Sequence, residues 1–321
     1  MHESFMKEAW SGRIDREEVP ELSLRLHQCV QPFAPSESPS AEGVVVIGFC
    51  SDEGVKRNQG RIGAAHAPNQ LRRFLSQLPW QTNLPVYDAG NIDCQDGQLE
   101  AAHLALAEQV ALVLAHRGFP FILGGGHEVA YGSWLGLVTH LERSIADHSV
   151  RPTIGIINFD AHFDLRKAEQ SSSGTPFYQI AEACNARNID FHYACFGVSE
   201  TANTLALFER ADALNVCVRK DKALTLLDLP SARAQLASFM KDCDLIYLTI
   251  DLDVFPAAVA PGVSAPAPRG VSLEVIESLI DEIKATGKLA VADIAEYNPT
   301  YDIDNHTARV AARLFYTITR G

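Results

Sequence analysis

Short apolar runs, bounded by polar or turn-forming residues, recur along the chain. Runs of this length predict buried strands, because a helix needs about ten or more residues of regular pattern. The eight runs are Val44–Phe49, Leu84–Tyr87, Pro120–Leu123, Thr153–Phe159, His192–Phe196, Asn215–Val218, Leu245–Ile250 and Leu289–Val291. Longer segments between many of them carry apolar residues at helical spacing, which predicts helices. These segments are Gln98–His116, Tyr131–Asp147, Ser231–Lys241 and Ser272–Thr286.

The alternation of strands and helices predicts the class of fold. Strands joined through helices pair in parallel, and the helices then cover both faces of the sheet. The chain is therefore expected to be an α/β protein, with ligands at the carboxyl ends of its strands. Residues 43–321 show no linker and no repeat, which predicts a single domain. Residues 1–42 are mixed in character and include a Pro-, Ser- and Glu-rich stretch at Pro32–Pro39, so we expect an N-terminal extension with a helix and a surface connection, packed on that domain.

Acidic and imidazole side chains follow two of the predicted strands. Asp160, His162 and Asp164 come directly after one apolar run, and Asp251 and Asp253 come after another. If the backbone stays extended, a spacing of two places side chains on one face. Crowded carboxylates and imidazoles carry a high cost in repulsion and desolvation unless a cation lies among them. Either motif alone is weak evidence for a metal site. Two such motifs, each at the end of a predicted strand, favour a metal centre.

A glycine-rich turn supplies a further candidate ligand. Gly124, Gly125 and Gly126 follow the predicted strand Pro120–Leu123 and permit a sharp turn with close backbone approach, which presents His127 at the strand end. A phosphate-binding loop is disfavoured, because no Lys-Ser/Thr follows the glycines. By itself the segment favours a strand-to-helix turn with His127 as an incidental surface histidine. The two acidic motifs favour the interpretation as a metal ligand.

Together the motifs offer four carboxylates and two imidazoles, which suit two divalent ions. Oxygen-rich ligation with some imidazole and no thiolate favours Mn²⁺, with Zn²⁺, Fe²⁺ or Co²⁺ as alternatives. Two ions roughly 3.5–4 Å apart can share one water and lower its pKa. Strand-end carboxylates that cap helix N-termini are the alternative, which explains one aspartate but not six groups.

Charge and composition limit the classes of molecule that the protein is expected to bind and the compartment in which it is expected to lie. The formal net charge is -13, which argues against a nucleic-acid or anionic-membrane surface and leaves a small-molecule substrate as the expected partner. No apolar stretch is long enough to span a bilayer, and the polar start lacks a signal-peptide apolar region, so we expect a cytoplasmic protein. The seven cysteines form no C-x-x-C pair, which favours reduced thiols over a disulfide framework.

Three further residues are candidates for binding a substrate. Asp293 and Glu296 follow the last apolar run and could hold a cationic, amidine-like group, although one of them could instead cap the next helix. Arg166 lies two residues beyond Asp164 and would point the same way in extended backbone. Its guanidinium could neutralise the cluster or clamp a carboxylate, and a solvent-facing arginine is the alternative.

These motifs, in this order, resemble the ureohydrolase family of arginases, agmatinases and formimidoylglutamases. The matching segments are Gly124-Gly125-Gly126-His127, Asp160-Ala161-His162-Phe163-Asp164, Asp251-Leu252-Asp253 and Glu296-Tyr297-Asn298-Pro299. The resemblance implies a three-layer αβα fold with an eight-stranded parallel sheet, two Mn²⁺ per subunit and a homo-oligomer. Carried over by position, the implied metal ligands are His127, Asp160, His162, Asp164, Asp251 and Asp253.

The sequence also indicates which branch of that family the chain resembles. Phe177 stands where arginases carry a histidine, and Ser173-Gly174-Thr175 stands where agmatinases tend to show H-G-T. Arg166 replaces a neutral asparagine of the arginases and suits a substrate with an additional carboxylate. Together with the early segment Asp52–Arg61, these features resemble the formimidoylglutamase branch.

That resemblance implies hydrolysis of N-formimidoyl-L-glutamate to L-glutamate and formamide in histidine degradation. Asp164 would pass a proton to the leaving amine, and Glu296 would hold the amidine nitrogen. Arg166, Ser173 and Gly174 would bind the substrate. The alternatives are another ureohydrolase, such as a guanidino-acid hydrolase, an agmatinase or an arginase, and a non-catalytic metal-binding assembly protein. The six filled ligand positions argue against the last of these.

Overall fold

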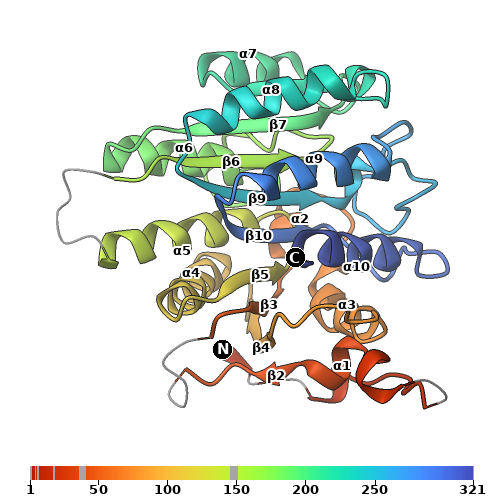
Figure 1. Ribbon diagram of the computed structural model, residues 1–321. Coiled ribbons are helices and arrows are strands. Elements are labelled where there is room, and N and C mark those ends of the chain that lie inside the picture. Colours follow the sequence, from red (N-terminus) through yellow and green to blue (C-terminus); the bar gives the residue numbers. More distant parts are fainter. Residues whose placement is uncertain are drawn as a thin grey trace.

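A central parallel sheet, covered by helices on both faces, forms the body of the computed structural model (Figure 1). The structure describes residues 2–3, 5, 7–16, 19–35, 41–144 and 151–320. All eight predicted strands are present, and the predicted three-layer α/β fold is confirmed. In sheet order they are β4 (Val86–Asp93), β3 (Val44–Cys50), β5 (Phe119–Leu123), β10 (Leu289–Ala295), β9 (Leu245–Asp251), β6 (Ile154–Phe159), β7 (His192–Val198) and β8 (Cys217–Lys220).

The sheet is larger than the eight strands expected, because two strands of two residues each extend it beside β4. β1 (His2–Glu3) pairs with β4 in antiparallel orientation, and β2 (Gln31–Pro32) pairs with it in parallel. Neither segment carries an apolar run, so the sequence pattern held no signal for them. The helix expected in this region is the four-residue α1 (Leu26–Cys29), and residues 36–40 of the Pro-rich stretch lie outside the described residues.

Two groups of helices cover the two faces of the sheet and bury two hydrophobic clusters. On one face lie α3 (Ala67–Leu75), α8 (Leu229–Lys241), α9 (Leu273–Ala285) and α10 (His306–Thr319). On the other lie α4 (Leu99–Ala115), α5 (Val129–Ser144), α6 (Pro176–Arg187) and α7 (Leu205–Ala213). The predicted helix Tyr131–Asp147 corresponds to α5, and its last three residues lie outside the described part of the chain. Among the described residues, no helix has the length and apolar character needed to cross a membrane.

A buried ion pair ties α3 to the sheet. Arg72 on α3 is fully buried, and its Nε and Nη2 donate to the two carboxylate oxygens of Asp88 on β4 at 3.0 and 2.8 Å. Trp10 Nε1 donates to the same carboxylate at 2.6 Å, so a residue of the N-terminal segment is anchored to the sheet as well. Because both charges are removed from water, neither partner can be lost without leaving the other uncompensated.

We predict that Arg72→Leu lowers the free energy of unfolding by about 3–5 kcal/mol, because Asp88 is left as an unpaired buried charge. Urea unfolding followed by circular dichroism measures the change. The control is Arg313→Leu, which breaks the exposed pair with Glu277 and is expected to cost about 0–1 kcal/mol. Equal losses in the two variants would contradict the prediction.

Candidate metal centre

The candidate ligands lie on loops at the carboxyl ends of neighbouring strands. β5, β10, β9 and β6 are adjacent in the sheet, and parallel strands end at the same edge. His127 follows β5, Asp160 follows β6, Asp251 is the last residue of β9 and Glu296 follows β10. The sheet order therefore brings together residues that are far apart in the sequence.

The turn after β5 needs glycines because other backbone atoms pack closely against it, as the sequence predicts. A Cβ at Gly125 would lie 1.8 Å from the carbonyl oxygen of Ser51, and one at Gly124 would lie 2.7 Å from that of Ile294. The backbone is also bonded to both neighbouring strand ends: Gly126 N donates to Ser51 O, and Glu296 N donates to Gly125 O. The turn is thereby wedged between β3 and β10, and it places His127 over the edge of the sheet.

The segment from Asp160 to Asp164 is not extended, so the predicted reason for the convergence of its side chains is wrong. β6 ends at Phe159, and Asp164 has a φ of 47°, in the left-handed region. The loop curls around Asn203, which accepts from Phe163 N at 3.0 Å and donates to Ala161 O at 2.9 Å. This curl, and not a strand face, directs the three side chains into the cluster.

The structure brings all six predicted ligands together in two overlapping groups. His127, Asp160, Asp164 and Asp251 form one group, and Asp160, His162 and Asp253 form the other, with the potential ligand atoms of each group within 4.8 Å of one another. His127 Nδ1 lies 3.1 Å from Asp160, 2.9 Å from Asp164 and 3.2 Å from Asp251. His162 Nδ1 lies 2.9 Å from Asp253 and 3.6 Å from Asp160. Asp160 thus belongs to both groups.

The protein alone balances this charge poorly. Burial and the charges of Asp253 and Asp160 raise the pKa of Asp251 well above its ordinary value. Burial and the charge of Asp160 raise the pKa of Asp164 to about 6. Burial alone would lower the pKa of His127, but the carboxylates around its ring raise it well above the ordinary value. The cluster therefore carries an excess of negative charge.

The surroundings of His127 fit a divalent cation. Within the part of the chain that the structure describes, its buried Nδ1 has no partner with hydrogen-bond geometry, although three carboxylate oxygens lie 2.9–3.2 Å away. A cation among these atoms would accept the imidazole lone pair and offset the carboxylates. Aspartate oxygens with imidazole nitrogen are a donor set that suits Mn²⁺.

Outer contacts orient the ligands. His127 Nε2 lies 3.0 Å from Thr249 Oγ1, which leaves Nδ1 to face the cluster. Asn158 Nδ2 donates to Asp160 Oδ2 at 2.9 Å, and the backbone N–H of Asp253 donates to Asp251 at 2.8 Å. Such contacts hold a ligand set in place before any ion binds.

Of the two acidic residues proposed for a cationic substrate, the structure supports only Glu296. Asp293 is fully buried within β10 and accepts from Tyr247 Oη at 2.6 Å, so the expectation that it holds substrate is wrong. Glu296 lines the cleft over the metal cluster, accepts from His127 N at 2.9 Å through Oε1 and has a φ of 67°. Its buried Oε2 has no hydrogen-bond partner among the described residues. Strained backbone of this kind is often found at active sites.

A cleft of about 330 Å³ opens over the cluster, at the lower end of the size range of small-molecule sites. Its lining includes Glu296 and the cluster residues His162, Asp164, Asp251 and Asp253. Asn58, Arg166 and Ser173 lie outside the cluster, also line the cleft and form what we call its outer wall. Arg166 is exposed, and its backbone N–H donates to Gly174 O at 2.8 Å. Gly174 supports Arg166 from behind, because a Cβ there would lie 2.8 Å from Arg166 Cδ.

Two residues of the cleft, Asn58 and Arg61, were not singled out from the sequence. Arg61 Nε donates to Ser264 O at 2.9 Å, and its guanidinium lies 4.1 Å from the ring centre of Tyr301. Both residues lie in the early segment Asp52–Arg61, whose family resemblance was the signal available before the structure.

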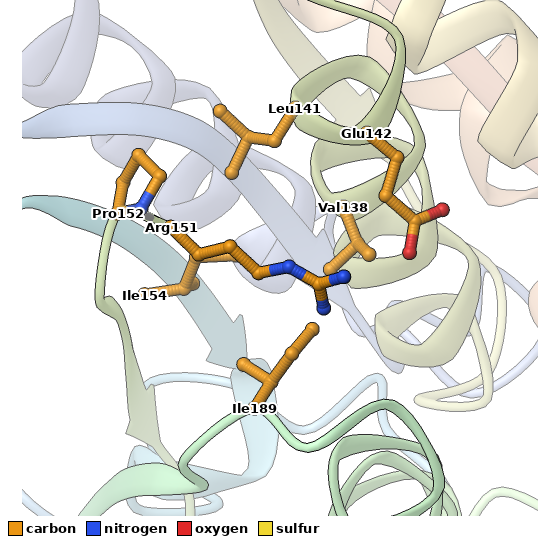
Figure 2. Close-up of a pocket in the computed structure, with 7 residues that line it drawn as sticks. All are labelled: Val138, Leu141, Glu142, Arg151, Pro152, Ile154 and Ile189. Atoms are coloured by element: carbon orange, nitrogen blue, oxygen red, sulfur yellow. The ribbon is translucent and has the colours of Figure 1, made fainter. Parts of the chain in front are cut away.

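A second pocket, shown in Figure 2, lies at the other end of the sheet, beside the first residue of β6, Ile154. Val138, Leu141 and Ile189 line it together with the charged residues Glu142 and Arg151. Its volume of about 20 Å³ has room for about one water and for no substrate. The cleft over the metal cluster is the better candidate for an active site.

Comparison with known proteins agrees with this geometry. A family model described as the arginase family matches residues 42–320. A relative from Aeromonas hydrophila named formimidoylglutamase is 56% identical over 312 residues, covering 97% of this chain and 96% of the relative, and one of the same name from Chromobacterium violaceum is 50% identical, covering 97% of each. The solved formiminoglutamase of Trypanosoma cruzi with Mn²⁺ is similar at a TM-score of 0.77 and 25% identity, covering 92% of this chain and 97% of that one.

Proposed function

We propose, since this chain belongs to the arginase family, that it hydrolyses N-formimidoyl-L-glutamate to L-glutamate and formamide, a step of histidine degradation. The observation that carries the proposal is the position of Arg166, which lines the cleft over the metal cluster. A guanidinium there suits an amidine that also bears a carboxylate. The relatives named formimidoylglutamase, at up to 56% identity over nearly the whole chain, support the same activity. Assembly into a homo-oligomer and a cytoplasmic location stay predictions.

The resident metal in this proposal is a pair of Mn²⁺ ions, the metal of the similar Trypanosoma cruzi structure. His127, Asp160, Asp164 and Asp251 would hold one ion, and Asp160, His162 and Asp253 the other. When bound, such a pair lowers the pKa of a water and stabilises negative charge on the substrate.

The side chains around the cluster supply binding, orientation and proton transfer. The unpartnered Oε2 of Glu296 is available to an amidine N–H, which would orient the formimidoyl carbon over the cluster. Asp164 lines the same cleft and can carry a proton to the departing nitrogen. Arg166 and Ser173 would hold a substrate carboxylate, with Gly174 supporting the arginine stem.

Another amidine hydrolase is the alternative function. A guanidino-acid hydrolase would also use Arg166, since its substrate carries a carboxylate. Agmatine has no carboxylate, and its cationic tail would be repelled by the guanidinium.

A substrate panel tests the function directly. With the Mn²⁺-loaded protein, kcat/KM should be highest for N-formimidoyl-L-glutamate and roughly 10- to 100-fold lower for agmatine, which loses a charged hydrogen bond worth about 1.5–3 kcal/mol. Arginine and 4-guanidinobutyrate complete the panel, with product formation measured by mass spectrometry. Faster turnover of any other member would overturn the proposal in favour of that activity.

Arg166→Ala should raise KM for N-formimidoyl-L-glutamate roughly 10- to 100-fold, because a charged hydrogen bond to the substrate carboxylate is lost. Steady-state kinetics and metal analysis are measured together, and the metal content should not change. Lys167→Ala is the matched control, since it removes the neighbouring cation, which lies over the ring of Tyr178. An unchanged KM in Arg166→Ala would exclude the clamp.

Asp160→Asn and His162→Asn should differ in the metal that they retain. Asp160 belongs to both ligand groups, whereas His162 belongs to one. We therefore expect Asp160→Asn to lose both ions and His162→Asn to keep close to one ion per chain. Atomic emission after gel filtration measures the metal, with circular dichroism to verify folding. Equal metal content in the two variants would show that Asp160 is not shared.

A further inference from the structure

We infer that Asn58 is a positioning residue that directs the hydroxyl proton of Ser173 toward the ligand, so that the outer wall of the cleft presents hydrogen-bond donors to a substrate. This wall would select substrates that carry a carboxylate. The inference rests on the proposed function only in that the substrate is an acid, and it does not depend on which acidic amidine is hydrolysed.

Asn58 determines which way the proton of Ser173 points. Its Nδ2 donates to Ser173 Oγ at 3.2 Å, so the serine oxygen is already an acceptor in that bond. A hydroxyl has a single proton, which must then point elsewhere. In the described part of the chain, this hydroxyl donates no hydrogen bond to another residue, and both residues line the cleft. The proton is therefore available to a bound carboxylate.

Arg166 lies against the same wall. A Cβ at Gly174 would be 2.8 Å from Arg166 Cδ, 3.1 Å from Arg166 Nε and 3.2 Å from Asn58 Nδ2. The arginine stem and the asparagine amide thus meet over the bare backbone of Gly174. The guanidinium and the Ser173 hydroxyl proton can only donate toward a ligand at this place, and the Asn58 amide turns its NH₂ toward the same wall.

The contact between Asn58 and Ser173 is held from outside the cleft. Asn58 directly follows α2 (Glu53–Arg57) and caps it, with its N–H donating to Gly54 O at 2.9 Å. Arg57, the last residue of α2, donates to Ser171 O at 3.0 Å and pairs with Glu100 at 2.7 Å. The end of α2 and the loop that carries Ser173 are therefore fastened together, so the bond to Ser173 is part of a built structure.

A wall that presents a guanidinium and a hydroxyl proton to the ligand discriminates by charge. A carboxylate has only acceptors and can satisfy the Ser173 proton and the Arg166 guanidinium at once. An amine at the same place would bring further donors and a positive charge, which the Arg166 guanidinium repels. An aspartate at position 58 would reverse the arrangement, because its carboxylate takes the Ser173 proton and repels the substrate.

The experiment uses the full-length, Mn²⁺-loaded protein and the variants Asn58→Ala, Asn58→Asp, Ser173→Ala and the double alanine variant. KM and kcat for N-formimidoyl-L-glutamate are measured, together with calorimetric binding of L-glutamate, which needs no turnover. Asn83→Ala is the matched control: this exposed asparagine lies in the segment that leads into β4, at the opposite end of the sheet.

We expect each single alanine variant to raise KM and weaken L-glutamate binding about 2- to 10-fold, as for one hydrogen bond, with kcat and metal content little changed. The double variant should be no worse than Ser173→Ala alone, because the two residues act as one unit. Asn58→Asp should be worse than Asn58→Ala, and Asn83→Ala should match the unmodified protein. Additive losses in the double variant, or equal binding by Asn58→Asp and Asn58→Ala, would overturn the inference.

The kinetic measurement and the binding measurement together distinguish failure of this inference from failure of the proposed function. If the unmodified protein hydrolyses no amidine but L-glutamate affinity follows the expected order, the proposed function fails and the inference stands. If N-formimidoyl-L-glutamate is hydrolysed but the variants do not follow that order, the inference alone fails. A protein that neither hydrolyses the amidine nor binds L-glutamate overturns both.

Discussion

The repulsion among the buried carboxylates around His127 is the constraint on which the site depends. Asp160, Asp164 and Asp251 all place an oxygen within 3.2 Å of the same imidazole nitrogen. Side chains of one charge do not gather in this way through their own attraction, so the backbone must hold them. Divalent ions offset this repulsion. Because the fold holds the carboxylates together without an ion, the relief of the repulsion adds to the affinity for metal.

The parallel sheet provides that backbone. Four adjacent strands end at one edge, and each contributes a short, tightly held loop or a strand-end residue. The glycine turn wedged against Ser51 and the loop curled around Asn203 show how closely these loops are fitted to the sheet. Because these loops are held by one edge of the sheet, they can keep the ligands in the geometry that the metal requires, and the loops need not move far when an ion binds.

Much of this organisation could be predicted from the sequence, because it is written in local patterns. Apolar runs located every long strand, and ligand-type residues at the ends of those runs located the cluster. Other features depend on contacts that no local pattern reports. Asp293 has the same local setting as a ligand, yet a tyrosine of the neighbouring strand occupies it. Asn58 meets Ser173 across 115 positions of the chain, which no spacing rule connects.

The balance of charge between the aspartates and two divalent ions explains why the outer wall, and not the metal cluster, would determine which substrate binds. The four aspartates together carry as much negative charge as two divalent ions carry positive charge, so the loaded cluster is nearly neutral. Glu296 then offers a carboxyl oxygen to an amidine, and Arg166 offers a positive group to whatever the amidine carries. In a chain with a net charge of -13, such a local cation is what admits an acid to the cleft. Specificity within this fold can therefore change at the loops beyond Asp164 while the metal chemistry stays the same.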